Sequence, residues 1–142
     1  MQRIKINLPE KFVFQTVIAV QIGDINYGNH LANDAVLRLC HEARLRFLAA
    51  YNYSELNIEG CGLIMADAAI QYINQAFYGD ELRFYLGIGN IGRADFSLIT
   101  QIVRQNDDKE IARIKNGMVF FDYQQQKVAQ TPENFRKTFQ AA

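Results

Sequence analysis

The sequence predicts a single α+β domain in which an antiparallel sheet wraps around one long helix. One β-type segment near the start of the chain is followed by a strongly apolar helical segment, and four long β-type segments come after it. Hydrophobic residues make up 49% of the 142 residues, which is enough for a sizeable core. No linker, internal repeat or low-complexity stretch divides residues 1–142.

The first strand is predicted over residues 12–22, where β-branched and aromatic residues dominate. A loop over residues 23–33 follows, and Asn33 is the expected N-cap of the next helix. Asp34 then lies in the first helical turn, where the helix dipole favours a negative charge.

The long helix is predicted to run from residue 34 to about residue 51. Apolar residues cover much of its circumference, so we expect other parts of the chain to surround it. The residues expected to be most buried are Val36, Cys40, Ala43 and Phe47. Charged residues of alternating sign follow one another at four-residue spacing and predict a ladder of ion pairs. These residues are Asp34, Arg38, Glu42 and Arg46.

The remainder of the chain predicts antiparallel sheet. The expected strands are residues 63–74, 81–91, 95–105 and 110–123. Glycine, asparagine and aspartate mark the turns between the later strands. A short terminal helix is expected to start at Pro132, with Thr131 as its cap.

Composition excludes several classes of partner. Fifteen basic and fifteen acidic residues give a formal net charge of zero without a basic cluster, which argues against nucleic acid or an anionic membrane surface. No apolar run approaches the roughly 20 residues of a membrane span, and residues 1–10 lack the apolar core of a signal peptide. We therefore expect a cytoplasmic protein with Cys40 and Cys61 as free thiols.

The segment from Gly23 to Asp34 is the richest in polar groups that can do chemistry. Two aspartates, three asparagines and a histidine lie there, directly before the apolar helix. The first N–H groups of a helix have no internal acceptor. Polar side chains gathered at such a helix start can therefore bind an oxygen anion or orient a water molecule.

This segment resembles the signature of hot-dog-fold acyl thioesterases of the 4-hydroxybenzoyl-CoA thioesterase-like superfamily. There, a strand ends in an Asp-rich, Gly-His-Val-Asn-Asn-like turn, and a long helix with Glu-Ala-Arg follows, as in residues 42–44 here. Residues 79–82 (Gly-Asp-Glu-Leu) and 111–113 (Ile-Ala-Arg) add to the similarity, which covers residues 12–125. The resemblance implies a hot-dog domain that hydrolyses an acyl-CoA or acyl-carrier-protein thioester. It also implies a homodimer or a dimer of dimers, with no cofactor other than the CoA of the substrate. No metal is expected, because no cluster of histidine, cysteine and carboxylate residues has the spacing of metal ligands.

Thioester hydrolysis requires a carboxylate that attacks the carbonyl or activates water, and donors for the developing oxyanion. The resemblance places Asn26 where the family turn has an aspartate. Asparagine cannot act as a base, although it can orient water, so the carboxylate is expected from Asp24, Asp34 or Asp67. Asp34 and Asp67 rank first, because Asp34 lies beside free helical N–H groups and Asp67 lies in an apolar strand, where an idle charge is costly.

His30 is expected to donate to the thioester carbonyl or to hold the turn. The resemblance implies substrate-binding roles for the other residues of the turn and for two arginines that would meet the CoA phosphates. These residues are Tyr27, Gly28, Asn33, Arg93 and Arg113.

Two alternative functions remain open on the sequence. Residues 23–26 (Gly-Asp-Ile-Asn) match the start of the Gly-Asp-x-Asn-Pro-x-His motif of (R)-specific enoyl-CoA hydratases, but Tyr27 replaces the proline and His30 comes one position late. A non-catalytic protein that binds acyl-CoA is the other alternative, because Asn26 occupies the aspartate position.

Overall fold

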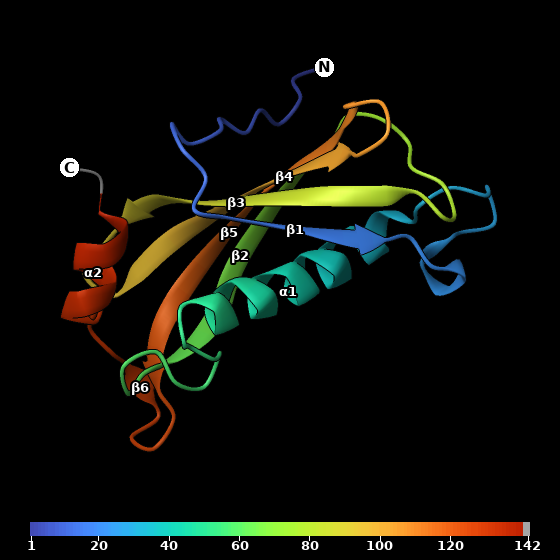
Figure 1. Cartoon of the computed structure of the whole chain (residues 1–142). Helices are drawn as coiled ribbons and strands as arrows, with labels where there is room; N and C mark the ends of the chain where they lie inside the picture. The colour runs from blue at the N-terminus through green and yellow to red at the C-terminus, as the bar shows by residue number, and fades with distance from the viewer. Residues whose placement is uncertain (141–142) are drawn as a thin grey trace.

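The computed structural model describes residues 1–140 and shows one antiparallel sheet curved around a long helix (Figure 1). The elements in chain order are β1 (Phe14–Ala19), the 3-10 turn η1 (Ile22–Asp24), α1 (Asn33–Ala50), β2 (Gly62–Tyr72), β3 (Glu81–Ile91), β4 (Asp95–Arg104), β5 (Glu110–Asp122), β6 (Lys127–Val128) and α2 (Glu133–Phe139). The strand order is β1-β3-β4-β5-β2, and the short β6 pairs with β5. The predicted arrangement of strand, long helix and four strands is confirmed.

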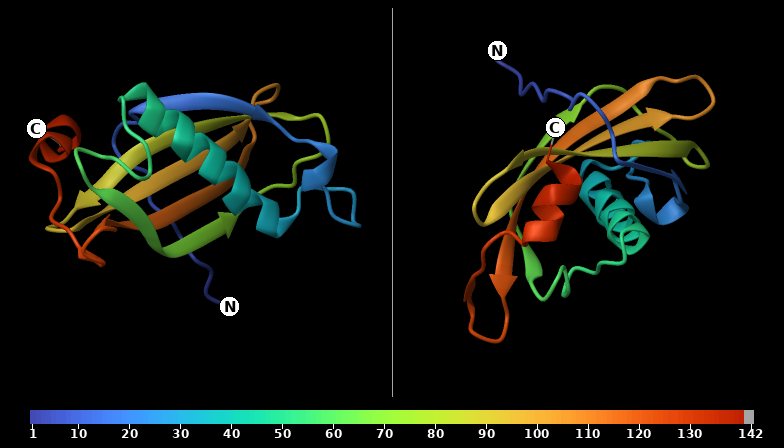
Figure 2. Two further views of the ribbon diagram at one scale, coloured as in Figure 1. Left: turned by 90° about the horizontal axis from the view of Figure 1, so that it is seen from below. Right: turned by 60° about the vertical axis from the view of Figure 1, so that its left-hand side comes forward.

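Helix α1 lies against the concave face of the sheet, and α2 closes one end of the core (Figure 2). The four residues expected to be most buried, Val36, Cys40, Ala43 and Phe47, are all buried. From α2, the Phe135 ring packs against that of Phe96, with 4.8 Å between their centroids. In the same way the Phe47 ring of α1 packs against that of Phe14 of β1, with 5.9 Å between their centroids, so aromatic packing links both helices to the sheet.

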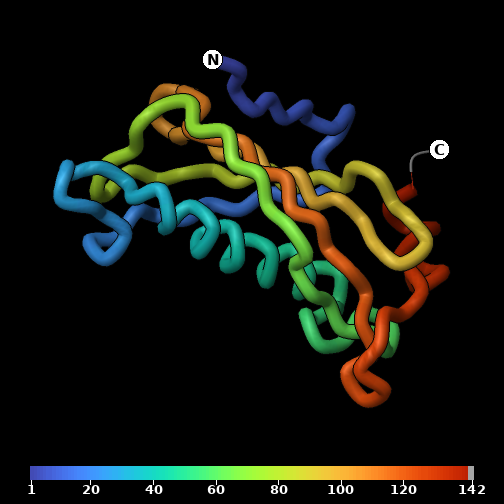
Figure 3. The backbone as a smooth tube through the Cα atoms, turned by 180° about the vertical axis from the view of Figure 1, so that it is seen from behind, coloured from blue at the N-terminus to red at the C-terminus, as the bar shows by residue number. Residues whose placement is uncertain are grey.

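The first twelve residues lie across the sheet face opposite α1 (Figure 3). Ile6 is buried there; its N–H donates to Gln71 Oε1 at 3.0 Å, and its carbonyl accepts from Arg113 Nη1 at 2.9 Å. A Cβ on Gly87 would lie 2.5 Å from Pro9 Cγ, so glycine at this position lets the segment approach the sheet closely. Both sheet faces are thus partly covered, by α1 and by the N-terminal segment.

Several local predictions are corrected by the structure. Ala32, not Asn33, occupies the N-cap of α1, and no side chain caps the helix start. Pro132 occupies the N-cap of α2, while the Thr131 hydroxyl donates to the Gly92 carbonyl at 2.8 Å. A tertiary acceptor thus takes the hydroxyl that was expected to cap the helix.

The predicted ladder of ion pairs along α1 forms only in part. Glu42 and Arg46 pair at 2.8 Å. Arg38 instead reaches Asp24 at 2.8 Å. Asp24 lies in the turn before the helix and is mostly shielded from water, so it is a stronger partner for Arg38 than a solvent-exposed neighbour on the helix.

Strand β2 forms one edge of the sheet. It pairs with β5 over Gly62–Tyr72, with a bulge between Met65 and Asp67, and its other side has no partner strand among residues 1–140. Met65 and Tyr72 on this strand are 43% and 46% exposed. An unpaired edge of this length with apolar side chains is a surface that proteins usually cover.

Among the described residues, no helix combines the length and the apolar character needed to cross a membrane.

Candidate active site at the start of the long helix

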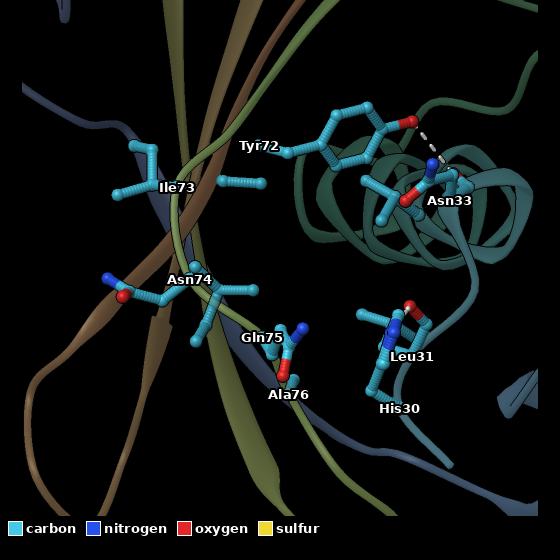
Figure 4. A pocket seen from close by; sticks show the side chains of 11 residues that line it. His30, Leu31, Asn33, Tyr72, Ile73, Asn74, Gln75 and Ala76 are labelled. Atoms are coloured by element: carbon cyan, nitrogen blue, oxygen red, sulfur yellow. Dashed lines mark hydrogen bonds between the residues drawn. The ribbon is translucent and has the colours of Figure 1, made fainter. Parts of the chain in front are cut away.

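A cavity of about 220 Å³ lies where α1 begins, between the loop before α1 and the segment that follows β2 (Figure 4). Its polar lining consists of His30, Asn33, Tyr72, Asn74 and Gln75. Apolar side chains, among them Val36 and Ile111, form the rest of the wall. The cavity thus combines a few polar groups with an apolar wall, as small-molecule sites commonly do.

Backbone hydrogen bonds bring the walls of the cavity together. The Leu31 N–H donates to the Ala76 carbonyl at 2.7 Å and joins the loop before α1 to the segment after β2. The Ala32 N–H donates to the Asp24 carbonyl at 2.9 Å and folds the loop back on itself. These bonds place His30 and Asn33 opposite residues that are distant in the sequence.

Asn26 shapes the turn that carries His30. Its Oδ1 accepts the Gly28 N–H at 2.9 Å, and its own N–H donates to the His30 carbonyl at 3.0 Å. Asn29 has a φ of 66°, a left-handed conformation that asparagine tolerates. A Cβ on Gly28 would lie 3.2 Å from His30 Nε2, so glycine leaves room for the imidazole ring. Tyr27, at the tip of this turn, is fully exposed.

His30 lines the cavity directly, and its Nδ1 lies 3.3 Å from the Leu31 carbonyl oxygen. When Nδ1 carries the proton it donates to that carbonyl and limits rotation of the ring. The imidazole is therefore held at the cavity wall beside the start of α1.

The three candidate carboxylates have different surroundings. Asp24 is buried; its Oδ1 accepts from Arg38 and its Oδ2 accepts the Gln21 N–H, at 2.8 and 2.9 Å. Asp67 Oδ1 accepts the Gly117 N–H at 3.0 Å on the sheet, and Asp67 is not part of the cavity lining. Asp34 is exposed in the first turn of α1. Only Asp34 is both adjacent in sequence to a cavity residue and uncommitted to a structural hydrogen bond among the described residues.

Tyr72 reaches the start of α1 from the end of β2. Its hydroxyl donates to the Asn33 carbonyl at 3.0 Å (Figure 4). Burial raises the pKa of the Tyr72 phenol, and the negative charge of Asp34 raises it further. The hydroxyl therefore keeps its proton at neutral pH and remains a hydrogen-bond donor.

Neither of the two arginines predicted to bind CoA lines this cavity. Arg113 pairs with Glu110 at 2.7 Å and holds the N-terminal segment through the Ile6 carbonyl. Arg93 is exposed in the turn between β3 and β4, where it lines a second cavity beside α2. That turn and the start of α1 lie at opposite ends of the molecule (Figure 1).

Sequence reasoning missed Tyr72, Asn74 and Gln75 as part of the site. They carry no local motif that would mark them in the sequence. Only the fold reveals them, because it brings the end of β2 beside the start of α1. Cys40 is a different case: burial raises its pKa to about 12, so its thiol is not a candidate nucleophile.

Comparison with protein families gives a match over most of the chain. The family model described as the thioesterase-like superfamily matches residues 20–139. None of the curated proteins compared with the chain matches it.

Solved structures share the fold at low sequence identity. A 1,4-dihydroxy-2-naphthoyl-CoA thioesterase from Synechocystis is 22% identical with a TM-score of 0.80, covering 89% of this chain and 94% of its own. A thioesterase superfamily protein from Jannaschia is 19% identical with a TM-score of 0.82, covering 92% and 83%. A gentisyl-coenzyme A thioesterase is 18% identical with a TM-score of 0.76, covering 87% and 99%. These similarities confirm the predicted hot-dog fold.

Proposed function

We propose that this chain, which belongs to the thioesterase-like superfamily, hydrolyses the thioester bond of an acyl-CoA in the cavity at the start of α1. One observation carries the location: the first turn of α1 opens at the cavity, and its N-cap is Ala32, whose side chain cannot accept a hydrogen bond. Serine, threonine, aspartate or asparagine at that position would occupy one of the free N–H groups. With alanine there, these N–H groups remain available to a ligand.

The first-turn N–H groups are suited to the step in which charge develops. When water adds to the thioester carbonyl, its oxygen becomes negative, and fixed N–H donors at a helix start stabilise that charge. The tetrahedral intermediate then collapses and the carbon–sulfur bond breaks. The departing thiolate takes up the proton that was removed from the water, and the CoA thiol and a free acid are released. We assign the oxyanion site to the backbone at Asn33 and Asp34. His30 adds a donor only in the form in which Nε2 carries a proton.

Asp34 is the proposed base that takes the proton from the attacking water. Asp34 is exposed and directly follows the cavity residue Asn33, although it is not itself part of the lining, whereas Asp24 is held by Arg38 and Asp67 by Gly117. Asn26 acts indirectly in this proposal, because it shapes the turn that carries His30. In this proposal, neither the addition of water nor the breaking of the carbon–sulfur bond requires a metal or a cofactor beyond the CoA of the substrate.

Thiol release from a panel of acyl-CoA substrates tests this proposal. We expect Asp34→Asn to lower kcat at least tenfold, which corresponds to about 1.4 kcal/mol in the barrier. Asp24→Asn and Asp67→Asn are run in parallel, and Asp108→Asn, in the turn between β4 and β5, is a remote control. If all three candidate variants stay within about threefold of wild type, roughly 0.7 kcal/mol, the base lies elsewhere.

The same assay separates the alternatives. An enoyl-CoA substrate that loses its absorbance without thiol release would identify a hydratase. Binding of acyl-CoA without either reaction would identify a binding protein.

We further propose that the protein forms a homodimer through the free edge of β2, with a dimer of dimers as the larger alternative. The support is the unpaired edge with its exposed apolar residues Ile64 and Met65. Antiparallel pairing of two β2 strands would bring the Gly62 end of one subunit beside the Tyr72 end, and hence the cavity, of the other. A monomer in sedimentation at micromolar concentration would contradict this assembly.

The cytoplasmic location inferred from the sequence stays a prediction.

A further inference from the structure

Tyr72 connects two elements that meet only at the cavity. It is the last residue of β2, and its hydroxyl donates to the carbonyl of Asn33, the first residue of α1 (Figure 4). In the sheet, Tyr72 lies opposite Ala112 of β5, a buried residue that also lines the cavity. The tyrosine therefore ties the edge strand to the helix start from inside the cavity.

The start of α1 depends on such external contacts. Ala32 gives it no side-chain cap. Its loop is joined to the rest of the fold through the Leu31–Ala76 bond, and the Ala32–Asp24 bond lies within the loop itself. Both bonds precede the first helical residue. Of the hydrogen bonds described, the bond from Tyr72 is the one that links the backbone of the first turn to the sheet.

The chemistry of the phenol fits a permanent donor. The Asn33 carbonyl can accept only if the Tyr72 hydroxyl is protonated, and burial together with the Asp34 charge favours the protonated form. The Tyr72 side chain is half exposed, so the contact is not simply part of the core.

We propose that Tyr72 is a positioning residue for thioester hydrolysis, which through Asn33 holds the first-turn N–H groups of α1 where the oxyanion develops. This inference rests on the proposed function. A shift of the helix start would misalign those donors with the charge of the transition state more than with the uncharged carbonyl of the bound substrate. Loss of the tyrosine hydroxyl should therefore lower kcat and leave KM nearly unchanged.

The test compares Tyr72→Phe with Tyr51→Phe. Both variants keep the ring and remove one hydroxyl that donates to a backbone carbonyl, because the Tyr51 hydroxyl donates to Val13 at 2.9 Å. Tyr51 follows the last residue of α1 and does not line the cavity, so it matches the chemical change at the other end of the same helix. Each variant is measured for kcat, KM, thermal stability and hydrogen exchange of the first-turn amides of α1.

We expect Tyr72→Phe to lower kcat about five- to tenfold with KM within about twofold, and to speed exchange in the first turn of α1. Tyr51→Phe should leave kcat, KM and first-turn exchange unchanged, even if its thermal stability falls as much as that of Tyr72→Phe. Equal kcat in wild type and Tyr72→Phe would overturn the proposal, as would equal losses in both variants. If the wild type releases no thiol, the proposed function fails, and unchanged first-turn exchange in Tyr72→Phe would separately overturn the positioning role.

Discussion

Replacement of Phe47 by alanine tests how α1 is held within the sheet. The Phe47 side chain is 1% exposed. Its ring centroid lies 5.9 Å from that of Phe14 in β1, 5.3 Å from that of Tyr51 and 5.6 Å from that of Phe139 on α2. The ring thus touches the sheet, its own helix and the terminal helix at once.

We expect Phe47→Ala to lower the free energy of unfolding by about 3–5 kcal/mol, the usual range for this change in a core. The value should lie in the upper part of that range. The change removes three aromatic pairs as well as buried apolar area. Each pair contributes about 0.5–1.5 kcal/mol in addition to the burial of its apolar area. The neighbouring rings belong to separate elements, so they cannot easily close the cavity that the change leaves.

Denaturant unfolding at fixed protein concentration, followed by circular dichroism, gives the change in free energy. Leu45→Ala on the same helix is the control, because Leu45 is 41% exposed and its loss should cost about 1 kcal/mol or less. An unfolding midpoint for Phe47→Ala that matches the control would refute the placement of α1 at the centre of the core.

Two further predictions concern charge. Burial acts to raise the pKa of Glu55, but hydrogen bonds from His41 and Arg44 hold it below its ordinary value. The carboxylate therefore stabilises the fold above the ordinary glutamate pKa and loses this contribution as pH falls through the lowered value. Thermal melts should show wild type more stable than Glu55→Gln at pH 7, with a gap that narrows by pH 3; a constant gap would contradict this. Arg93 lies far from the cavity of its own chain and can reach CoA only across the proposed β2–β2 dimer, which brings the Gly62 end of one copy beside the cavity of the other. On that assembly Arg93→Ala should raise KM for acyl-CoA about two- to fivefold at low salt and less at high salt, since an exposed charge contact is weak and screened. An unchanged KM in both buffers would exclude Arg93 from CoA binding.

The secondary structure followed from local patterns in the sequence, and the same patterns suggested where to look for a site. The strand predicted over residues 81–91 has these bounds in the structure, and the long helix begins one residue earlier than predicted. Hydrophobic periodicity determines these elements, because it decides which side of a segment can be buried. The turn from Gly23 to Asp34 was located in the same way, since its polar residues directly precede an apolar helix.

The partners of the polar side chains could not be read from the sequence. Arg38 was expected to pair with a helix neighbour, yet it binds Asp24, and Arg113 holds the carbonyl of Ile6. Tyr72 reaches Asn33 because the chain passes from β1 at one edge of the sheet, through α1, to β2 at the other edge beside β5. Local spacing limits which residues can share a helix or strand face, but hydrogen-bond partners depend on strand order and on how the loops close. The sequence alone therefore determined the elements and suggested a candidate site, and the tertiary structure decided which of its side chains are free to act.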